Sequence, residues 1–265
     1  MSAPVATPRA LAVGGLDPSA GAGVLLDALV MARLGYQPAV AVTTVTAQNS
    51  AQFGGAWAVE PETLIAQLDA VLAEGAFSCV KVGALGSERL ALTLAAWLAH
   101  ARLPVVVFDP VLASSSGGSL VDGATRAVNA VARVSTVITP NAEEAMQLSG
   151  VTDARDAARS LAQCYDVAVA VTGLAGGSDA EAVDVLWDAG RLTELPHPLL
   201  AGVGDVRGTG CMLSSALACH FANGLRVDDA LSAAHATVHE LLASAGPLGH
   251  GRWQLDLARI ARADT

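Results

Sequence analysis

The chain has 265 residues, of which 52% are hydrophobic, 4% aromatic and 15% charged. This length and composition allow one large buried core, so we expect a single domain spanning residues 1–265. The formal net charge of −10 at pH 7 argues against a protein that holds nucleic acid through clustered basic residues. The chain contains one lysine, Lys81.

Apolar runs alternate along the chain with segments of helical periodicity. The runs expected to form buried strands are residues 10–13, 39–45, 79–82, 105–108, 136–138 and 167–171. Ala and Leu recur at three- and four-residue spacing between them, and the expected helices are residues 22–34, 61–72, 88–100, 123–131, 142–148 and 154–164. This alternation predicts an α/β fold, with a doubly wound, mainly parallel sheet and helices on both faces.

The pattern changes after Thr172. Two strand-like pieces, 182–187 and 191–195, are separated by a turn signal, Asp188-Ala189-Gly190, and predict a small antiparallel hairpin. No internal repeat or low-complexity linker divides the chain. The last expected helices are residues 210–223, 227–245 and a short one near 255–261.

Several features of the sequence favour the cytoplasm. Residues 1–9 lack the basic-then-apolar order of a signal peptide, and no apolar run is long enough to span a bilayer. The chain has four cysteines, Cys79, Cys164, Cys211 and Cys219. Their spacing fits neither a disulfide framework nor a redox motif nor a zinc site. We therefore expect a cytoplasmic protein without a metal-thiolate centre.

Two glycine-rich loops each precede a predicted helix. Residues 14–23 follow the first strand, where the ligands of open α/β sheets gather, although tight packing explains such a turn equally well. In the second loop Gly208, Thr209 and Gly210 begin a helix, and their unpaired amides form a candidate anion hole for a transferring phosphoryl group. Cys211 comes next, where a helix dipole would lower the pKa of the thiol and favour a role as proton acceptor. A packed core thiol is the alternative.

Polar residues follow two more of the predicted strands. Asn141 and Glu144 have the spacing of a reciprocal capping box, which explains them structurally. The functional alternative is that Glu144 orders a magnesium-bound water. Asp109 ends another strand at the same sheet edge. Two loops and two carboxylates at one edge together favour a phosphate and metal site.

The chain resembles the hydroxymethylpyrimidine and phosphomethylpyrimidine kinases of thiamine biosynthesis, within the ribokinase-like superfamily. The resemblance covers nearly the whole chain and rests on an ordered set of motifs. They are residues 15–23 with Asp27, residues 46–50 (Thr-Ala-Gln-Asn-Ser), residues 81–85 (Lys-Val-Gly-Ala-Leu), Asp109-Pro110-Val111, Thr139-Pro140-Asn141 with Glu144, and Gly208-Thr209-Gly210-Cys211. Many relatives in the superfamily carry aspartate as the base where this chain has Cys211.

This resemblance implies a ribokinase-like fold and an ATP- and Mg²⁺-dependent kinase. The implied catalytic residues are Cys211 and the anion hole of Gly208, Thr209 and Gly210. The implied substrate-binding residues are Gly15, Ala22, Asp27, Gln48, Ala84 and Val111, with the amide of Gln48 reading the pyrimidine edge. The implied ATP- and phosphate-binding residues are Asp109, Asn141, Glu144, Thr172, Arg207 and His235. Asp109 and Glu144 are the implied magnesium residues, in part through water.

Four positions depart from the family pattern. Ala84 stands where the family usually has methionine, which makes the ring pocket shallower and open to a larger substituent. Thr172 replaces a phosphate-neutralising lysine, and Arg207 replaces a histidine, so the charge of Arg207 is expected to compensate. His235 replaces a lysine of the penultimate long helix, and a packed helix histidine is its alternative reading.

The resemblance implies phosphorylation of 4-amino-5-hydroxymethyl-2-methylpyrimidine, with its monophosphate as a candidate second substrate. The expected partners are this pyrimidine and ATP, the expected assembly is a homodimer, and neither nucleic acid nor a membrane is expected. Pyridoxal kinase is the first alternative, since Ala84 and Thr172 leave it open whereas Gln48 and Cys211 favour the pyrimidine. The second alternative is a pyrimidine-binding module without catalysis, against which the intact anion hole argues.

Overall fold

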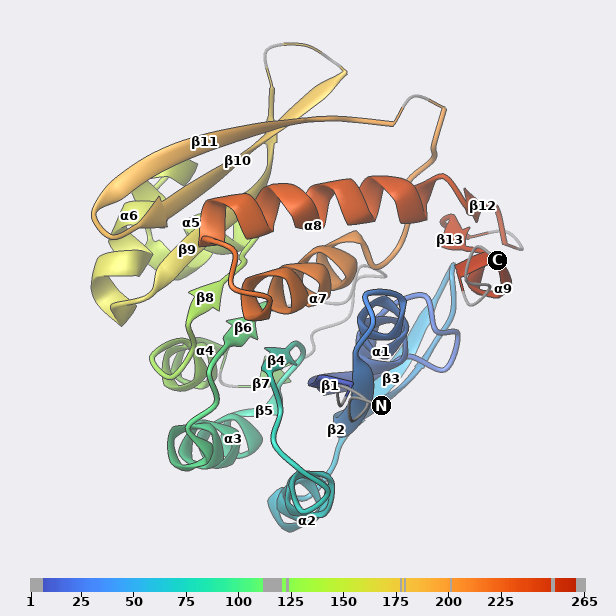
Figure 1. Cartoon of the computed structure of the whole chain (residues 1–265), viewed down its shortest axis with the longest axis vertical. Helices are drawn as coiled ribbons and strands as arrows, with labels where there is room; N and C mark the ends of the chain where they lie inside the picture. The colour runs from blue at the N-terminus through green and yellow to red at the C-terminus, as the bar shows by residue number, and fades with distance from the viewer. Residues whose placement is uncertain are drawn as a thin grey trace, which may run out of the picture.

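A mixed β-sheet forms the centre of the molecule (Figure 1). The computed structural model describes residues 7–111, 121–122, 124–176, 178, 180–200, 202–248 and 251–260. Within these ranges the main sheet has nine strands in the order β11-β10-β9-β8-β6-β4-β1-β2-β3. In chain order they are β1 (Arg9–Leu16), β2 (Gln37–Gln48), β3 (Phe53–Ala58), β4 (Cys79–Val82), β6 (Val106–Phe108), β8 (Val137–Ile138), β9 (Ala168–Ala175), β10 (Glu181–Asp188) and β11 (Arg191–Pro198).

The central strands of this sheet run parallel, whereas both edges are antiparallel. Strands β2, β1, β4, β6, β8 and β9 pair in parallel in that order. The predicted hairpin is β10–β11, and it extends the main sheet through antiparallel pairing with β9. Because β2 and β4 lie on opposite sides of β1, the order of strands reverses there. Ligands bind at such a switch point, beyond the carboxyl ends of the strands.

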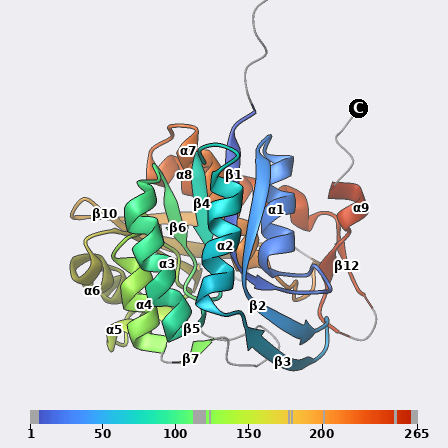
Figure 2. The same ribbon diagram turned by 90° about the horizontal axis from the view of Figure 1, so that it is seen from below.

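Helices cover both faces of the sheet, as predicted (Figures 1 and 2). On one face of the sheet, α2 to α6 pack over a core that includes Leu64, Leu94 and Val128. On the other face, α1, α7 and α8 pack over a second core that includes Leu26 and Leu217. The bounds of the helices are α1 (Gly23–Arg33), α2 (Pro61–Leu72), α3 (Glu88–Ala101), α4 (Ala124–Ala132), α5 (Ala142–Ser149), α6 (Ala154–Tyr165), α7 (Thr209–Ala222), α8 (Val227–Leu242) and α9 (Leu257–Ile260).

Local signals explain where several of these helices begin. The Ser87 side chain accepts a hydrogen bond from the amide of Leu90, and the Asp153 side chain accepts two from the first turn of α6. Pro61 occupies the first turn of α2, where its missing N–H costs nothing. Such caps satisfy amides that have no partner inside the helix, so these starts could be predicted from sequence.

The sequence prediction missed several short strands. Edge strand β3 is largely exposed and contains Gly54 and Gly55, so it lacks the apolar pattern of a buried strand. The other missed strands have two residues each and form two small sheets. Strand β5 (Gly86–Ser87) pairs with β7 (Val121–Asp122), and β12 (Ala245–Gly246) pairs with β13 (Gln254–Leu255).

Other differences from prediction lie at the ends of elements. The helix expected over 227–245 ends at Leu242, because residues 245–246 pair as a strand instead. Three expectations fall at least partly outside the described residues. They concern the first residue of the helix expected over 123–131, the last residue of the short helix expected near 255–261, and most of the segment 1–9 that was considered as a signal peptide. None of the described helices combines the length and the apolar character that crossing a membrane requires.

Candidate active site

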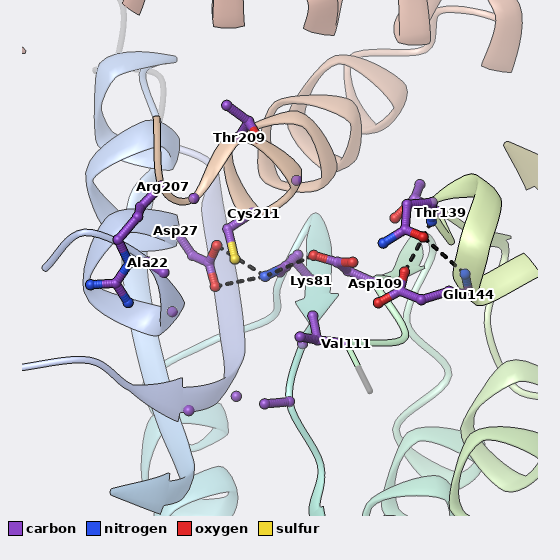
Figure 3. A pocket seen from close by; sticks show the side chains of 18 of the residues that line it. Ala22, Asp27, Lys81, Asp109, Val111, Thr139, Glu144, Arg207, Thr209 and Cys211 are labelled. Atoms are coloured by element: carbon purple, nitrogen blue, oxygen red, sulfur yellow. Dashed lines mark hydrogen bonds and ion pairs between the residues drawn. The ribbon is translucent and has the colours of Figure 1, made fainter. Parts of the chain in front are cut away.

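A cavity of about 250 Å³ lies at the switch point, beyond the carboxyl ends of β1, β4 and β6 (Figure 3). All of the predicted site residues except His235 line it. They are Gly15, Ala22, Asp27, Gln48, Ala84, Asp109, Val111, Asn141, Glu144, Thr172, Arg207, Gly208, Thr209, Gly210 and Cys211. Residues separated by almost 200 positions in the chain thus share one cavity.

The Gly208 turn holds the start of α7 against the first glycine loop. Gly208 caps α7 with φ 79°, a left-handed conformation that favours glycine. A Cβ atom at this position would overlap the carbonyl oxygen of Gly21 and the side chain of Leu26. Gly208 is therefore required both for the turn and for its close approach to the loop. The first amides of α7 have no partner within the helix and are available to an anion in the cavity.

Arg207 holds the first loop together. Its Nη2 atom lies 3.0 Å from Asp17 Oδ2 and donates to Gln48 Oε1 at 2.9 Å, while Nη1 donates to the carbonyl oxygen of Asn49 at 2.6 Å. The side chain is 1% exposed. Asp17 Oδ1 in turn accepts from the amide and hydroxyl of Ser19.

This placement gives Arg207 a role that the sequence did not predict. The guanidinium lies on the Ala22 side of the cavity, where Gln48 and Asn49 bind it (Figure 3). Arg207 thereby orients the Gln48 amide, whose oxygen it binds. Its expected compensation for the missing phosphate lysine stays a prediction.

Lys81 is a site residue that the sequence prediction did not assign. Its Nζ atom lies 3.0 Å from both carboxylate oxygens of Asp27 and 3.8 Å from Asp109 Oδ2, and its side chain is 1% exposed. Ser215 donates to Asp27 and Ser214 donates to Asp109. The available signal was a single lysine, in an acidic chain, within an apolar strand. A buried charge of this kind requires a partner.

The charges in this cluster influence one another. Burial by itself would lower the pKa of Lys81. The adjacent Asp27 and, more weakly, Asp109 have the opposite and larger effect, so the pKa is raised and the ammonium keeps its proton. Burial also raises the pKa values of the Asp27 and Asp109 carboxyls, although Lys81 opposes that effect. The cluster places one cation between two carboxylates at the floor of the cavity.

The pKa expected for Cys211 is wrong. Cys211 does lie in the first turn of α7, as predicted. Burial nevertheless raises the pKa of its thiol to about 11; Lys81 opposes this, and the Asp27 and Asp109 carboxylates add to it. The effect of burial thus exceeds that of the helix terminus. The thiol form of Cys211 is therefore favoured at neutral pH in this structure.

The capping box predicted at α5 is confirmed. The Glu144 carboxylate accepts from the amide of Asn141 at 2.9 Å, and the Asn141 side chain accepts from the amide of Glu144 at 2.9 Å. Both residues also line the cavity. Next to them, the Thr139 hydroxyl is buried without a hydrogen-bond partner in the described part of the chain. Capping holds Asn141 and Glu144 at the cavity wall.

His235 lies in a second cavity of about 260 Å³, which shares Thr172, Thr209 and Gly210 with the first. Its Nε2 atom lies 2.6 Å from Asp184 Oδ2. Its side chain is 15% exposed, so it is neither solvent-facing nor fully packed. Apolar side chains, including Leu213 and Val238, line much of the rest of this second cavity.

The chain is similar in sequence and in fold to known vitamin kinases. The hydroxymethylpyrimidine/phosphomethylpyrimidine kinase of Streptomyces coelicolor is 37% identical over 260 residues, which cover 96% of this chain and 95% of that protein. The pyridoxal kinase of Bacillus subtilis, solved as an ADP complex, is 25% identical, with a TM-score of 0.84 over 96% of this chain and 98% of that one. A phosphomethylpyrimidine kinase from Clostridium difficile, 24% identical, has the same fold, with a TM-score of 0.74 over 88% of this chain and 98% of that one. The model of the phosphomethylpyrimidine kinase family matches residues 17–256, and this chain belongs to that family.

Proposed function

We propose that the chain transfers the γ-phosphoryl group of ATP to the hydroxymethyl group of 4-amino-5-hydroxymethyl-2-methylpyrimidine, with the monophosphate as a second substrate. The observation that carries this proposal is the single cavity that joins the Gly208–Cys211 turn to the Gln48 and Ala84 wall. An anion hole and a pocket for a small ring are thereby within reach of each other. Family membership makes the chain a kinase of thiamine biosynthesis.

The end of the cavity formed by Gln48 and Ala84 is suited to a small polar ring. The Gln48 oxygen is bound by Arg207, which fixes the amide plane relative to the cavity. Ala84 and Val111 contribute apolar walls, and Gly15 brings backbone close to Ala84, since a Cβ atom there would lie 3.5 Å from the Ala84 Cβ atom. A flat ring carrying nitrogen donors and acceptors fits this combination of polar edge and apolar faces.

The end of the same cavity at the start of α7 is suited to the transferring phosphoryl group. Amides at the start of α7 stabilise negative charge that develops on the phosphoryl oxygens, and the Cys211 side chain follows them on the same turn. Phosphoryl transfer depends mainly on positioning and charge stabilisation. We assign the thiolate form of Cys211 as the proton acceptor: it takes the proton of the alcohol as the alcohol oxygen bonds to the γ-phosphorus and ADP leaves. We assign Lys81 as the cation that keeps Asp27 and Asp109 in place.

The wall between Asp109 and Glu144 has donors that fit Mg²⁺. This ion prefers hard oxygen ligands, and the wall presents two carboxylates and the unpartnered hydroxyl of Thr139. We propose that Asp109 and Glu144 hold the ion, in part through water. When bound, Mg²⁺ neutralises charge on the phosphates. Asn141, Thr172 and His235 are proposed to contact the nucleotide from the same side and from the adjoining cavity.

A product assay tests this function directly. The enzyme is incubated with ATP, Mg²⁺ and either the pyrimidine, its monophosphate or pyridoxal, and products are identified by mass spectrometry. We expect the pyrimidine monophosphate to form with the highest kcat/KM. Preferred turnover of pyridoxal would identify the alternative that the small Ala84 side chain leaves open. Binding of the pyrimidine without any ATP-dependent product would refute the proposed reaction.

The homodimer and the cytoplasmic location remain predictions. The four cysteines are all unpaired, which is consistent with a reducing compartment. Strand β3 is an edge of the sheet, and its Trp57 is 61% exposed, which is consistent with a subunit contact there. Analytical ultracentrifugation of the wild type and of Trp57→Lys measures the assembly, and a monomeric wild type would contradict the prediction.

A further inference from the structure

Three potential metal ligands meet in the wall of the second cavity, apart from the proposed magnesium residues. Asp184 lies on β10, His197 on β11 and His235 on α8. In the hairpin, His197 pairs with Ala182, two residues before Asp184, so both side chains lie on one face of the sheet. Helix α8 packs against that hairpin and brings His235 to the same point (Figure 1). Tertiary structure therefore assembles the group from three separate elements.

The distances within this group are short. His197 Nε2 lies 3.2 Å from Asp184 Oδ1, and His235 Nε2 lies 2.6 Å from Asp184 Oδ2. One ligand atom from each of the three residues lies within 4.8 Å of the others. Two imidazoles and one carboxylate are a common ligand set for Zn²⁺ and related ions, whereas Mg²⁺ prefers oxygen alone. The donor set thus selects a different metal from the one proposed at Asp109.

Asp184 has an unusual charge environment. Its side chain is 0% exposed, and the only ion-pair partners found for it in the described part of the chain are the two imidazoles. Its Oδ1 atom also accepts from the amide of Gly173 at 3.0 Å. Burial raises the pKa of Asp184, but hydrogen bonds from His197, His235 and the Gly173 amide lower it to about 2. Asp184 is therefore an anion whose oxygens can serve as ligands to a divalent cation.

We propose that Asp184, His197 and His235 bind a borderline divalent transition metal ion, with Zn²⁺ as the representative ion. Three protein ligands leave a coordination position open toward the second cavity, where water or a phosphate oxygen completes the site. Occupancy would place a positive charge in the wall of this cavity, which shares Thr172 and Thr209 with the first cavity.

The rings must turn for the ion to bind. They now stack with centroids 3.7 Å apart and planes at 19°, and both Nε2 atoms face the carboxylate. Coordination moves each remaining ring proton to Nδ1 and splays the rings so that their lone pairs converge on the metal. Both side chains border the cavity, at 18% and 15% exposure, which leaves space for this rotation.

The test uses Co²⁺ as a spectroscopic probe on the full chain, freed of metals and nucleotide and without Mg²⁺. Cys164→Ser serves as the parent because that cysteine is exposed and could bind cobalt. His197→Gln and His235→Gln are compared with His220→Gln, a matched control whose imidazole pairs with Thr237 outside the cluster. Visible ligand-field absorption gives stoichiometry and affinity, and displacement by Zn²⁺ gives the competing affinity.

We expect one strongly absorbing, tetrahedral Co²⁺ per chain in the parent and in the control, because an ion held by oxygen ligands alone at Asp109 and Glu144 absorbs only weakly. In either ligand variant this strong absorption should show an affinity weaker by at least about tenfold. A cooperative melting transition without metal first shows that each variant folds. Added Zn²⁺ should then raise the melting temperature of the parent and the control but not that of the ligand variants. Equal cobalt affinity in all variants, or the absence of a ligand-field spectrum in the parent, would overturn the proposal. Neither readout depends on kinase activity.

Discussion

The Nζ atom of Lys81 lies 3.0 Å from each carboxylate oxygen of Asp27, and both side chains are 1% exposed. This ion pair connects β4 to α1 at the floor of the proposed active site. Asp109, at the end of the neighbouring strand β6, lies close enough for Lys81 to act on both carboxylates. One buried cation therefore supports the fold and the site together.

Replacing Lys81 with methionine should destabilise the protein. Removing one partner of a buried ion pair typically costs about 3–5 kcal/mol, because the other charge remains buried. Urea unfolding of Lys81→Met, Asp27→Leu and the double variant measures this. The double variant should lose clearly less stability than the sum of the single variants. Additive losses would show that the two side chains do not compensate each other.

Alkylation of Cys211 should be slow at neutral pH and increase steeply in alkali. Burial raises the pKa of the thiol to about 11, so below that pH the reactive thiolate increases about tenfold with each pH unit. Iodoacetamide labelling followed by peptide mass spectrometry measures the rate at each pH, with exposed Cys164 as the internal reference. If Cys211 reacts as fast as Cys164 at pH 7, burial does not control its pKa.

Cys211→Ala should lower kcat by about 10² to 10⁴ if Cys211 accepts the proton of the alcohol. Cys211→Ser should be slow but active, since positioning and charge stabilisation remain. Cys211→Asp should retain activity, because a carboxylate can take the same proton. Turnover is measured with saturating pyrimidine and ATP. Near-wild-type kcat in Cys211→Ala would show that Cys211 is only a packed thiol.

Gln48→Leu should raise KM for the pyrimidine and leave KM for ATP unchanged. Losing a paired, buried amide contact costs on the order of 1 to 3 kcal/mol. The variant also removes the acceptor that Arg207 binds at 2.9 Å, so Gln48→Glu is the matched control that keeps an oxygen there. Steady-state kinetics with each substrate varied provides the comparison, and an unchanged pyrimidine KM in Gln48→Leu contradicts the assignment.

Asp109→Asn and Glu144→Gln should reduce activity most at low Mg²⁺. Both residues line the cavity, and carboxylates bind this ion better than amides do. Activity is measured across a Mg²⁺ series together with the melting temperature. Glu144→Gln keeps an oxygen for the capping contact with the amide of Asn141, so its stability should change little. Equal losses at every Mg²⁺ concentration, with a lower melting temperature, would support a purely structural role.

Several features could be predicted from the sequence because they depend on neighbouring residues. Hydrophobic periodicity reports which face of each element is buried, so the alternation of strands and helices was recognisable. The capping box of Asn141 and Glu144 needs a spacing of only three residues. The glycines after β1 and before α7 marked turns that parallel strands bring to one edge of the sheet. The location of the cavity follows from these local patterns.

The tertiary structure decided the features that depend on residues far apart in the chain. The direction of Arg207 depends on acceptors at Asp17, Gln48 and Asn49, and its charge therefore serves the first loop. The pKa of Cys211 depends on burial and on charges that come from other elements, which a local reading of a helix start leaves out. The group of Asp184 with its two imidazoles likewise forms only after α8 packs on the hairpin. Electrostatic energy depends on distance and burial, and folding determines both.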